Sequence, residues 1–260
     1  MNLQLYPIEP QLQPYIKLIC TMECTDDTDT NHIRVLPDAC VEIFINYTDT
    51  PIAVIDNKEF QCSIVNARMS KPMDVQMRKG SGCLAICFFP GMAYKFFHAP
   101  MYLFSDTTIM LEDIWDDLAT RIVEDLANST NNSSRVAIVQ QILTNSLKDN
   151  AHDQQVVDCL QQIELSEKSL TVNQLVYLTG MSQRQLSRRF QQIVGLSPKE
   201  YLRVQRFIRS LKHLKRYPEH SLTEIAYESN YYDQAHFNRD YKAYTGCTPG
   251  EVTKSPHFLY

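Results

Sequence analysis

Basic and amide side chains recur at the spacing of one helical face in the last third of the 260-residue chain. One set follows Ser182 and the other follows Asp233. Because leucine and aromatic residues fill the intervening positions, we expect the polar side chains to face outward from two helices. Arginine pairs with guanine and glutamine with adenine in the major groove, so the pattern predicts contacts with DNA. The predicted contact residues are Gln183, Arg184, Ser187, Arg188, Gln234, Ala235, His236, Asn238 and Arg239.

Several basic side chains in this region have a structural alternative. Arg189 and Arg206 are equally suited to internal salt bridges, and His236 to packing. Arg239 is adjacent to Asp240 and is placed to pair with a neighbouring carboxylate.

The charge of the chain is divided unevenly. The net charge of −5 speaks against a uniformly basic DNA-binding protein. Residues 1–150 hold 11 Lys and Arg against 19 Asp and Glu, a net charge of −8. Residues 151–260 hold 14 against 11, a net charge of +3, and residues 184–216 hold ten basic residues and one acidic residue. A local basic stripe of this kind favours binding to nucleic acid.

A weak internal repeat defines the elements that carry these residues. Gly195-Leu-Ser-Pro-Lys-Glu200 recurs as Gly246-Cys-Thr-Pro-Gly-Glu251. In each copy the glycine suits the end of one helix, and Ser or Thr with Pro and Glu suits the start of the next. Three further pairs have capping-box spacing: Thr171 with Gln174, Ser182 with Gln185, and Ser221 with Glu224.

These helix-capping and helix-ending residues predict two copies of one unit, each with a short helix, a tight turn and a second helix. The units cover about residues 170–196 and 221–247, and one long amphipathic helix over Pro198–Arg216 joins them. An all-helical bundle with a solvated basic face is the alternative. Two copies with the same caps and a basic stripe favour paired helix-turn-helix units that bind DNA.

Leu175–Arg206 and Ile225–Val252 resemble the two DNA-binding units of AraC/XylS transcription regulators. The second unit is the closer, through Asp233-Gln-Ala-His-Phe-Asn-Arg239 and Gly246-Cys-Thr-Pro249. The resemblance implies that one chain recognises a non-palindromic site through successive major grooves, and that RNA polymerase is a partner.

The resemblance has departures that change local expectations. Val176 replaces a usual Ala, and Asn230-Tyr231-Tyr232 replaces a usual Gly-Phe-Ser. Because Tyr232 lacks the small hydroxyl that would cap a helix, we expect Asp233 to cap the second recognition helix.

The first hundred residues have a different pattern, with short β-branched and aromatic runs between turn residues. Helical spacing begins after them, in Glu112–Ala127 and Arg135–Leu147, and Lys148–Gln155 is a candidate linker. We therefore predict an α+β chain. Residues 1–150 form a β-rich, cupin-like barrel with a helical pair, and residues 151–260 form an all-α domain with the two units.

The N-terminal half also resembles a sensor domain found in some members of that family, through Val35–Asn46, Phe88–Gly91 and Leu111–Trp115. Ala39 stands where Gly is more usual, so the turn after Asp38 is expected to differ. The resemblance implies a small-molecule pocket in the barrel and dimerisation through the helical pair.

Residues that could support catalysis or metal binding are sparse in this half. His32 and His98 are too few for a metal-binding cupin, so we expect no metal and no cofactor. Asp38 and Glu42 form a possible carboxylate pair, although turn and strand-face roles suit them better. No phosphate-binding loop or nucleophile elbow occurs, so an enzyme is not predicted.

The cysteines offer an alternative way of sensing. Cys20 and Cys24, like Cys83 and Cys87, are four residues apart, with Cys40 and Cys62 between the pairs. Such thiols suit redox or metal sensing, but residues four apart share a strand face and buried cysteines are common.

The sequence therefore predicts a DNA-binding transcription regulator, with double-stranded DNA as partner and an unknown small-molecule effector acting on the N-terminal half. We expect a cytoplasmic protein with no membrane association and a possible homodimer. The alternatives are thiol or metal sensing by the N-terminal cysteines, and a regulator whose first half only dimerises.

Overall fold

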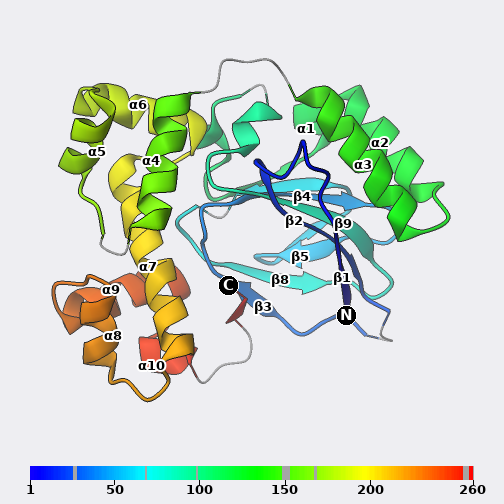
Figure 1. Cartoon of the computed structure of the whole chain (residues 1–260). Helices are drawn as coiled ribbons and strands as arrows, with labels where there is room; N and C mark the ends of the chain where they lie inside the picture. The colour runs from blue at the N-terminus through cyan, green and yellow to red at the C-terminus, as the bar shows by residue number, and fades with distance from the viewer. Residues whose placement is uncertain are drawn as a thin grey trace.

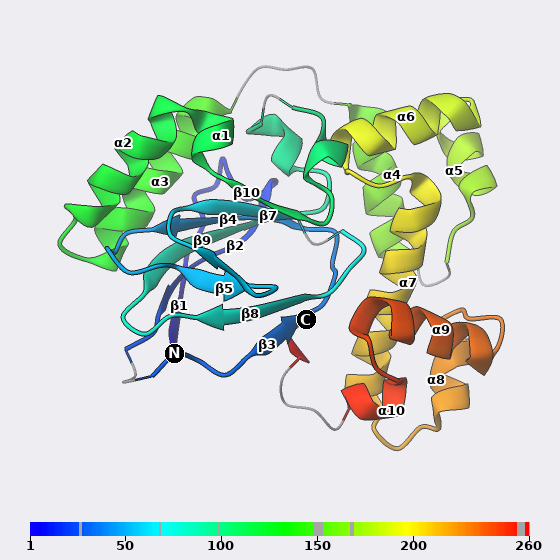
Figure 2. The ribbon, with the colours of Figure 1, turned by 180° about the vertical axis from the view of Figure 1, so that it is seen from behind.

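The structure is a computed structural model, and it describes residues 1–25, 28–67, 69–97, 99–147, 153–166 and 169–253, with the backbone of 258–259. His98 and most of the expected linker Lys148–Gln155 lie outside the described residues. Figures 1 and 2 show a β-rich half beside an all-helical half. The α+β class predicted from the sequence is confirmed.

Two sheets form the β-rich half. The six-stranded sheet is antiparallel, in the order β1 (Asn2–Tyr6), β2 (Ile16–Glu23), β9 (Gly82–Phe88), β4 (Val41–Asn46), β7 (Ile64–Ala67), β10 (Thr107–Met110). The five-stranded sheet has the order β11 (Phe258–Leu259), β3 (Ile33–Val35), β8 (Met73–Met77), β5 (Ala53–Ile55), β6 (Lys58–Phe60). Only β11 pairs in parallel among these strands, on the edge of β3.

Alternation along β4 explains how the sheets pack. Ile43 and Ile45 point to one face and are fully buried in the larger core, whereas Phe44 points to the other and packs in the smaller core. The smaller core lies between the sheets, because it also contains Met73 and Met77 of β8. The expected barrel is thus two sheets packed face to face.

Three helices cover the outer face of the six-stranded sheet: α1 (Glu112–Trp115), α2 (Asp117–Ala127) and α3 (Asn132–Ser146). Short 3-10 helices, η1 (Ala93–Lys95) and η2 (Met101–Phe104), precede them. Ile122 of α2 and Val139 of α3 are buried in the same core as Ile43. The apolar faces of α2 and α3 are therefore buried against the six-stranded sheet of the same chain.

The helical half contains α4 (Gln154–Leu165), α5 (Val172–Thr179), α6 (Gln183–Ile193), α7 (Pro198–Arg216), α8 (Leu222–Glu228), α9 (Gln234–Thr245) and α10 (Pro249–Val252). The long helix α7 has the predicted bounds and joins α5–α6 to α8–α9. All five predicted capping boxes are present, the fifth joining Thr248 to Glu251. Two helix-turn-helix units joined by a long helix are confirmed.

The two halves pack closely against each other. Gly91 lies at the contact, where a Cβ would come within 2.5 Å of Leu160 in α4. The C-terminal end of α6 packs on η2. A single hydrophobic core runs from the six-stranded sheet into the helical half. Within the described residues, no helix combines the length and apolar character needed to cross a bilayer.

Candidate nucleic-acid interface

Helix α6 is built to present its first turns to a partner. The Ser182 hydroxyl accepts a hydrogen bond from the backbone N–H of Gln185, and the side-chain oxygen of Gln185 accepts one from the backbone N–H of Ser182. This capping box satisfies two backbone N–H groups at the N-terminal end of the helix from within the chain. Leu186 and Phe190 are fully buried and fix the rotation of the helix. The predicted residues Gln183, Arg184, Ser187 and Arg188 then lie on the outer side, three of them exposed and Ser187 half-buried. With two neighbouring glutamines they line a shallow groove of about 850 Å³.

Helix α9 has the same plan with a different cap. Asn230 adopts the left-handed conformation (φ 64°) in the preceding turn, which asparagine tolerates. The Asp233 carboxylate accepts a hydrogen bond of 2.7 Å from the His236 backbone, so Asp233 is the cap, as predicted. Phe237 and Tyr241 are fully buried. The exposed residues of the helix include four of the predicted contacts: Gln234, Ala235, Asn238 and Arg239.

His236, the fifth residue predicted on α9, is half-buried and turned toward α7. Its Nε2 lies 3.1 Å from a guanidinium nitrogen of Arg206. Burial, together with the positive charge of Arg206, lowers the pKa of His236 below its usual value. This contact corresponds to the packing alternative for His236.

A buried carboxylate on α9 organises the junction with α7. Asp240 is 1% exposed, and its oxygens lie 2.7 Å from Arg203 and 3.3 Å from Arg206. Arg206 also stacks over the ring of Tyr231, at 4.7 Å from the centroid. Both arginines belong to the basic stripe, so part of that charge holds α9 on α7 and is not presented to a partner.

Arg189 has a similar internal role at the other unit. Its guanidinium forms a bidentate pair with Asp153, the residue that caps α4, and also donates to Gln155. The internal alternative therefore describes Arg189 and Arg206, whereas the carboxylate of Asp240, next to Arg239, pairs with Arg203 and Arg206.

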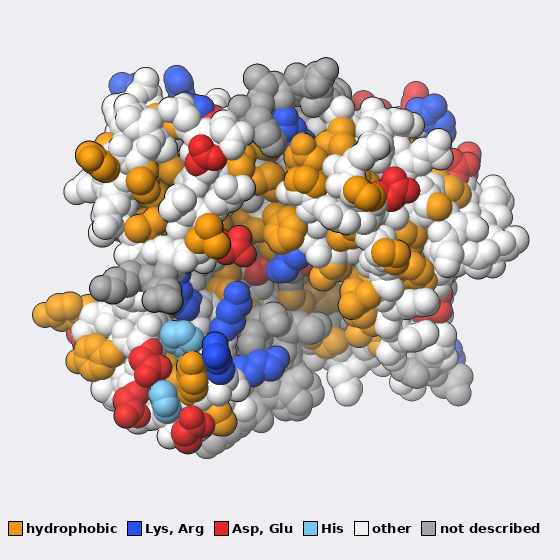
Figure 3. Space-filling view, viewed as in Figure 1, with side chains coloured by type: hydrophobic (Ala, Val, Ile, Leu, Met, Phe, Trp, Pro, Cys, Tyr) orange, Lys and Arg blue, Asp and Glu red, His pale blue; other side chains and the backbone are white. Residues whose placement is uncertain are grey.

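The exposed basic residues of the helical half lie on three helices. They include Arg184 and Arg188 on α6, Lys199 at the start of α7, Lys212, Lys215 and Arg216 near its end, and Arg239 and Lys242 on α9. Figure 3 shows basic side chains gathered over the lower part of α7 and others at the upper edge over α6. The basic surface is thus smaller than the stripe in the sequence suggests, and it is divided.

Both recognition helices are held at their C-terminal ends by the β-rich half. The Ser105 hydroxyl donates a 2.8 Å hydrogen bond to the carbonyl of Gly195, just beyond α6. Arg34 of β3 donates one of 3.1 Å to the carbonyl of Thr245, the last residue of α9. Figures 1 and 2 show α5 and α8 on the side of α7 away from the sheets, and α6 and α9 extending from there toward the β-rich half. The N-terminal ends with the predicted contact residues therefore face outward.

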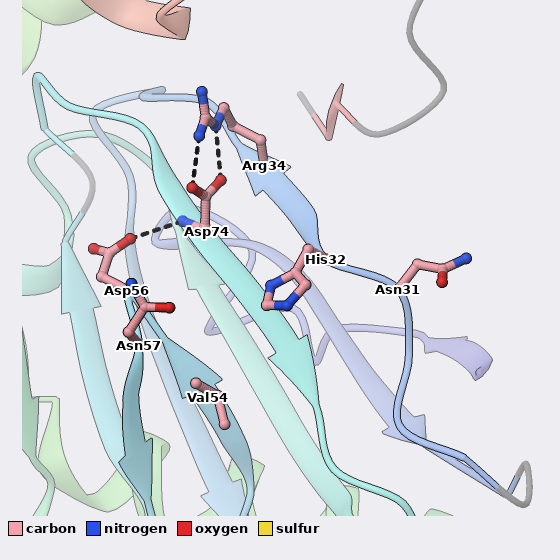
Figure 4. A pocket seen from close by; sticks show the side chains of 7 residues that line it. All are labelled: Asn31, His32, Arg34, Val54, Asp56, Asn57 and Asp74. Atoms are coloured by element: carbon pink, nitrogen blue, oxygen red, sulfur yellow. Dashed lines mark hydrogen bonds and ion pairs between the residues drawn. The ribbon is translucent and has the colours of Figure 1, made fainter.

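The contact between Arg34 and α9 adjoins a pocket on the outer face of the five-stranded sheet. Arg34 forms two short hydrogen bonds, 2.6 and 2.7 Å, to the carboxylate of Asp74, and Asp56 accepts one from the Asp74 backbone (Figure 4). The pocket has a volume of about 620 Å³ and is also lined by His32. The sequence analysis did not identify Arg34 or Ser105. Their partners in the helical half follow 90 or more positions later in the sequence, and no local pattern marks a residue with such a distant partner.

Comparison with known proteins gives matches in both halves. A family model described as "Helix-turn-helix domain" matches residues 175–255, and one described as "Domain of unknown function (DUF6597)" matches residues 4–110. The HTH-type transcriptional activators RhaS of Salmonella newport and Salmonella agona are each 36% identical over 73 residues, which is 28% of this chain. These matches agree with the resemblance of the helical half to AraC/XylS regulators.

The match spans 26% of the length of these relatives. Among solved structures, the chain is similar to ToxT from Vibrio cholerae, with 12% identity, 87% of this chain and 98% of that chain covered, and a TM-score of 0.44. The DNA-binding domain of AdpA in complex with a target DNA has 20% identity, covers 39% of this chain and 91% of its own, and has a TM-score of 0.36. The helix-turn-helix match over residues 175–255 agrees with the helix-turn-helix units predicted from the sequence.

Proposed function

We propose that the chain is a sequence-specific DNA-binding transcription regulator in which α6 and α9 enter successive major grooves. The observation that carries the proposal is the pair of capped helices whose first turns present polar side chains outward while their far ends are fixed. Arg184 and Gln234 are assigned to base edges, and Arg188 and Arg239 to phosphates or guanine. Ser187, Gln183, Ala235, Asn238 and His236 complete the proposed interface.

Residues 1–150 are proposed as the sensing part and residues 151–260 as the DNA-binding part. The first half carries the net charge of −8 and is unsuited to the DNA backbone. It contacts the C-terminal ends of both recognition helices, so an effector that binds it would change how the helices are presented. An effector in the pocket beside Arg34 would compete for the group that holds Thr245.

The remaining partners are part of the same proposal. RNA polymerase is proposed by family resemblance, and the cytoplasm is where the chain would reach DNA. A homodimer through the helical pair would have to use the outer faces of α2 and α3, since their apolar faces are buried against the sheet. Sedimentation of the whole chain at working concentration tests this part.

DNA selection is the direct test of the main proposal. The whole chain is used to enrich duplexes from a random pool, and the enriched site is footprinted. We expect protection over two major grooves about 34 Å apart on one face of the duplex, with affinity that falls steeply as salt rises. Failure to enrich any sequence, or protection of a single groove, would contradict the proposed mode of binding.

Ligand screening distinguishes a regulator whose N-terminal half senses a small molecule from one whose N-terminal half does not. A small molecule that binds the folded chain raises its melting temperature. An effector that raises the melting temperature and also changes DNA affinity supports sensing. A compound library that changes neither supports a purely structural first half.

A further inference from the structure

Two buried thiols and a carboxylate converge where the β-rich half meets α7. The Sγ atoms of Cys40 and Cys87 and one carboxylate oxygen of Asp38 all lie within 4.8 Å of one another. Cys40 is 1% exposed and Cys87 is 3% exposed. The spacing in the sequence does not reveal this group, because Cys40 lies in the turn before β4, Cys87 lies in β9, and only Cys87 belongs to a C-x₃-C pair.

The turn before β4 places two of the three side chains. Ala39 has a φ of 60°, and the Asp38 carboxylate accepts a 3.0 Å hydrogen bond from the Cys40 backbone. This turn directs the Asp38 and Cys40 side chains to one place. Lys17 of β2 lies over them, with Nζ 3.4 Å from Asp38 and 3.6 Å from Cys40. The site is therefore closed by a side chain that is 43% exposed and able to move.

The separation of the thiols fits an ion. Glu42 pairs directly with Cys87, which brings Cys40, two residues before Glu42, close to Cys87. The two sulfur atoms lie within 4.8 Å of each other. Two metal–sulfur bonds of about 2.3 Å each can span that separation.

We propose that Asp38, Cys40 and Cys87 bind a thiophilic divalent cation, with Zn²⁺ as the probe. Thiolate ligands select such ions, and three protein ligands leave the fourth tetrahedral position to water. Binding releases the two thiol protons to solvent as two metal–sulfur bonds form. The ion, two thiolates, one carboxylate and the Lys17 ammonium then sum to zero charge, as do the two thiols, the carboxylate and the ammonium before binding.

The position of the site would allow a bound ion to influence the proposed DNA-binding half. Tyr201, in the first turns of α7, is 4% exposed, and burial followed by the charge of Cys40 raises the pKa of its phenol. An ion here would fix the turn before β4, whose Ala39 lies in the same hydrophobic core as Tyr201 of α7. This regulatory consequence depends on the proposed function, whereas binding of the ion does not.

The test measures metal content in the whole chain. Reduced, metal-free protein is equilibrated with Zn²⁺, dialysed, and measured by elemental mass spectrometry, and Co²⁺ is used in parallel to detect thiolate charge-transfer absorption. We expect one ion per wild-type chain, loss of binding to background in Cys40→Ser and Cys87→Ser, and weaker binding in Asp38→Asn. Cys62→Ser is the matched control, because its half-buried thiol lies outside the cluster and its loss should leave the stoichiometry unchanged.

Circular dichroism of each metal-free variant checks its fold. If a serine variant unfolds, Asp38→Asn with the Co²⁺ spectrum decides, since that change keeps both thiols. Absence of Zn²⁺ from wild type, retention in both serine variants, or equal loss in Cys62→Ser would overturn the proposal. So would a Cys40–Cys87 disulfide formed by peroxide in a chain that takes up no Zn²⁺. Metal content is measured without DNA, so failure of the proposed DNA binding leaves this result interpretable.

Discussion

Replacing Asp240 by Asn should destabilise the packing of the second helix-turn-helix unit on α7. The carboxylate is 1% exposed, and its loss leaves Arg203 and Arg206 without their anionic partner on α9. Removing one partner from a buried ion pair costs about 3–5 kcal/mol. Arg203 is 43% exposed and regains water, whereas Arg206 is 19% exposed and regains little. We therefore expect the lower end of the range, about 3 kcal/mol.

Thermal unfolding followed by circular dichroism measures the effect. At about 3 °C per kcal/mol for a chain of this size, the loss corresponds to a melting temperature about 9 °C lower. Arg239→Ala is the control on the same helix, because Arg239 is exposed on the outer side of α9. That variant should keep the melting temperature and lose DNA affinity. The two changes on neighbouring residues thus separate stability from binding.

The outcome that refutes the argument is a small effect. If Asp240→Asn lowers stability by less than about 1 kcal/mol, the pair is worth no more than an exposed salt bridge. The arginines of α7 would then have to be considered again as groups available to DNA.

Three further predictions concern other parts of the chain. Arg184→Ala should cost about 1–3 kcal/mol in DNA affinity and relax specificity at one base pair, whereas equal loss on every sequence would assign Arg184 to phosphate. Arg34→Ala removes the hydrogen bond to Thr245, so hydrogen exchange should rise at the C-terminal end of α9 and stay unchanged in the β1–β2 hairpin. Burial holds the pKa values of His213 and His236 below their usual value, so the folded chain should lose stability as the pH falls below about 6.5, and replacing both by Gln should flatten that loss in urea titrations.

Local rules in the sequence account for most of the helical half. Each capping box uses residues three apart, and each buried face uses the helical period, so both are visible in a short window. The long helix Pro198–Arg216 and the Asp233 cap were predictable for this reason. The outward position of Arg184 follows from the buried position of Leu186 in the same way.

Contacts between distant residues could not be predicted from the same rules. The pairing of Asp240 with Arg203 depends on how two helices cross, and the charge count alone makes Arg203 look available. In the β-rich half the central strands were visible, but the exposed edge strand Asn2–Tyr6 lacks a buried face to mark it. Pairing of Cys40 with Cys87 requires the register of β4 on β9, which no single stretch encodes.

Strand β11 joins late residues of the chain to an early strand of the same sheet. Its partner β3 lies more than 200 residues earlier in the sequence and has β8 on its other side. Until β11 has been synthesised, that edge of β3 is open, and an open strand edge can pair with other chains. A fragment ending near residue 150 lacks β11 and keeps the edge open. Such a fragment should therefore aggregate more readily than a chain that includes Phe258 and Leu259.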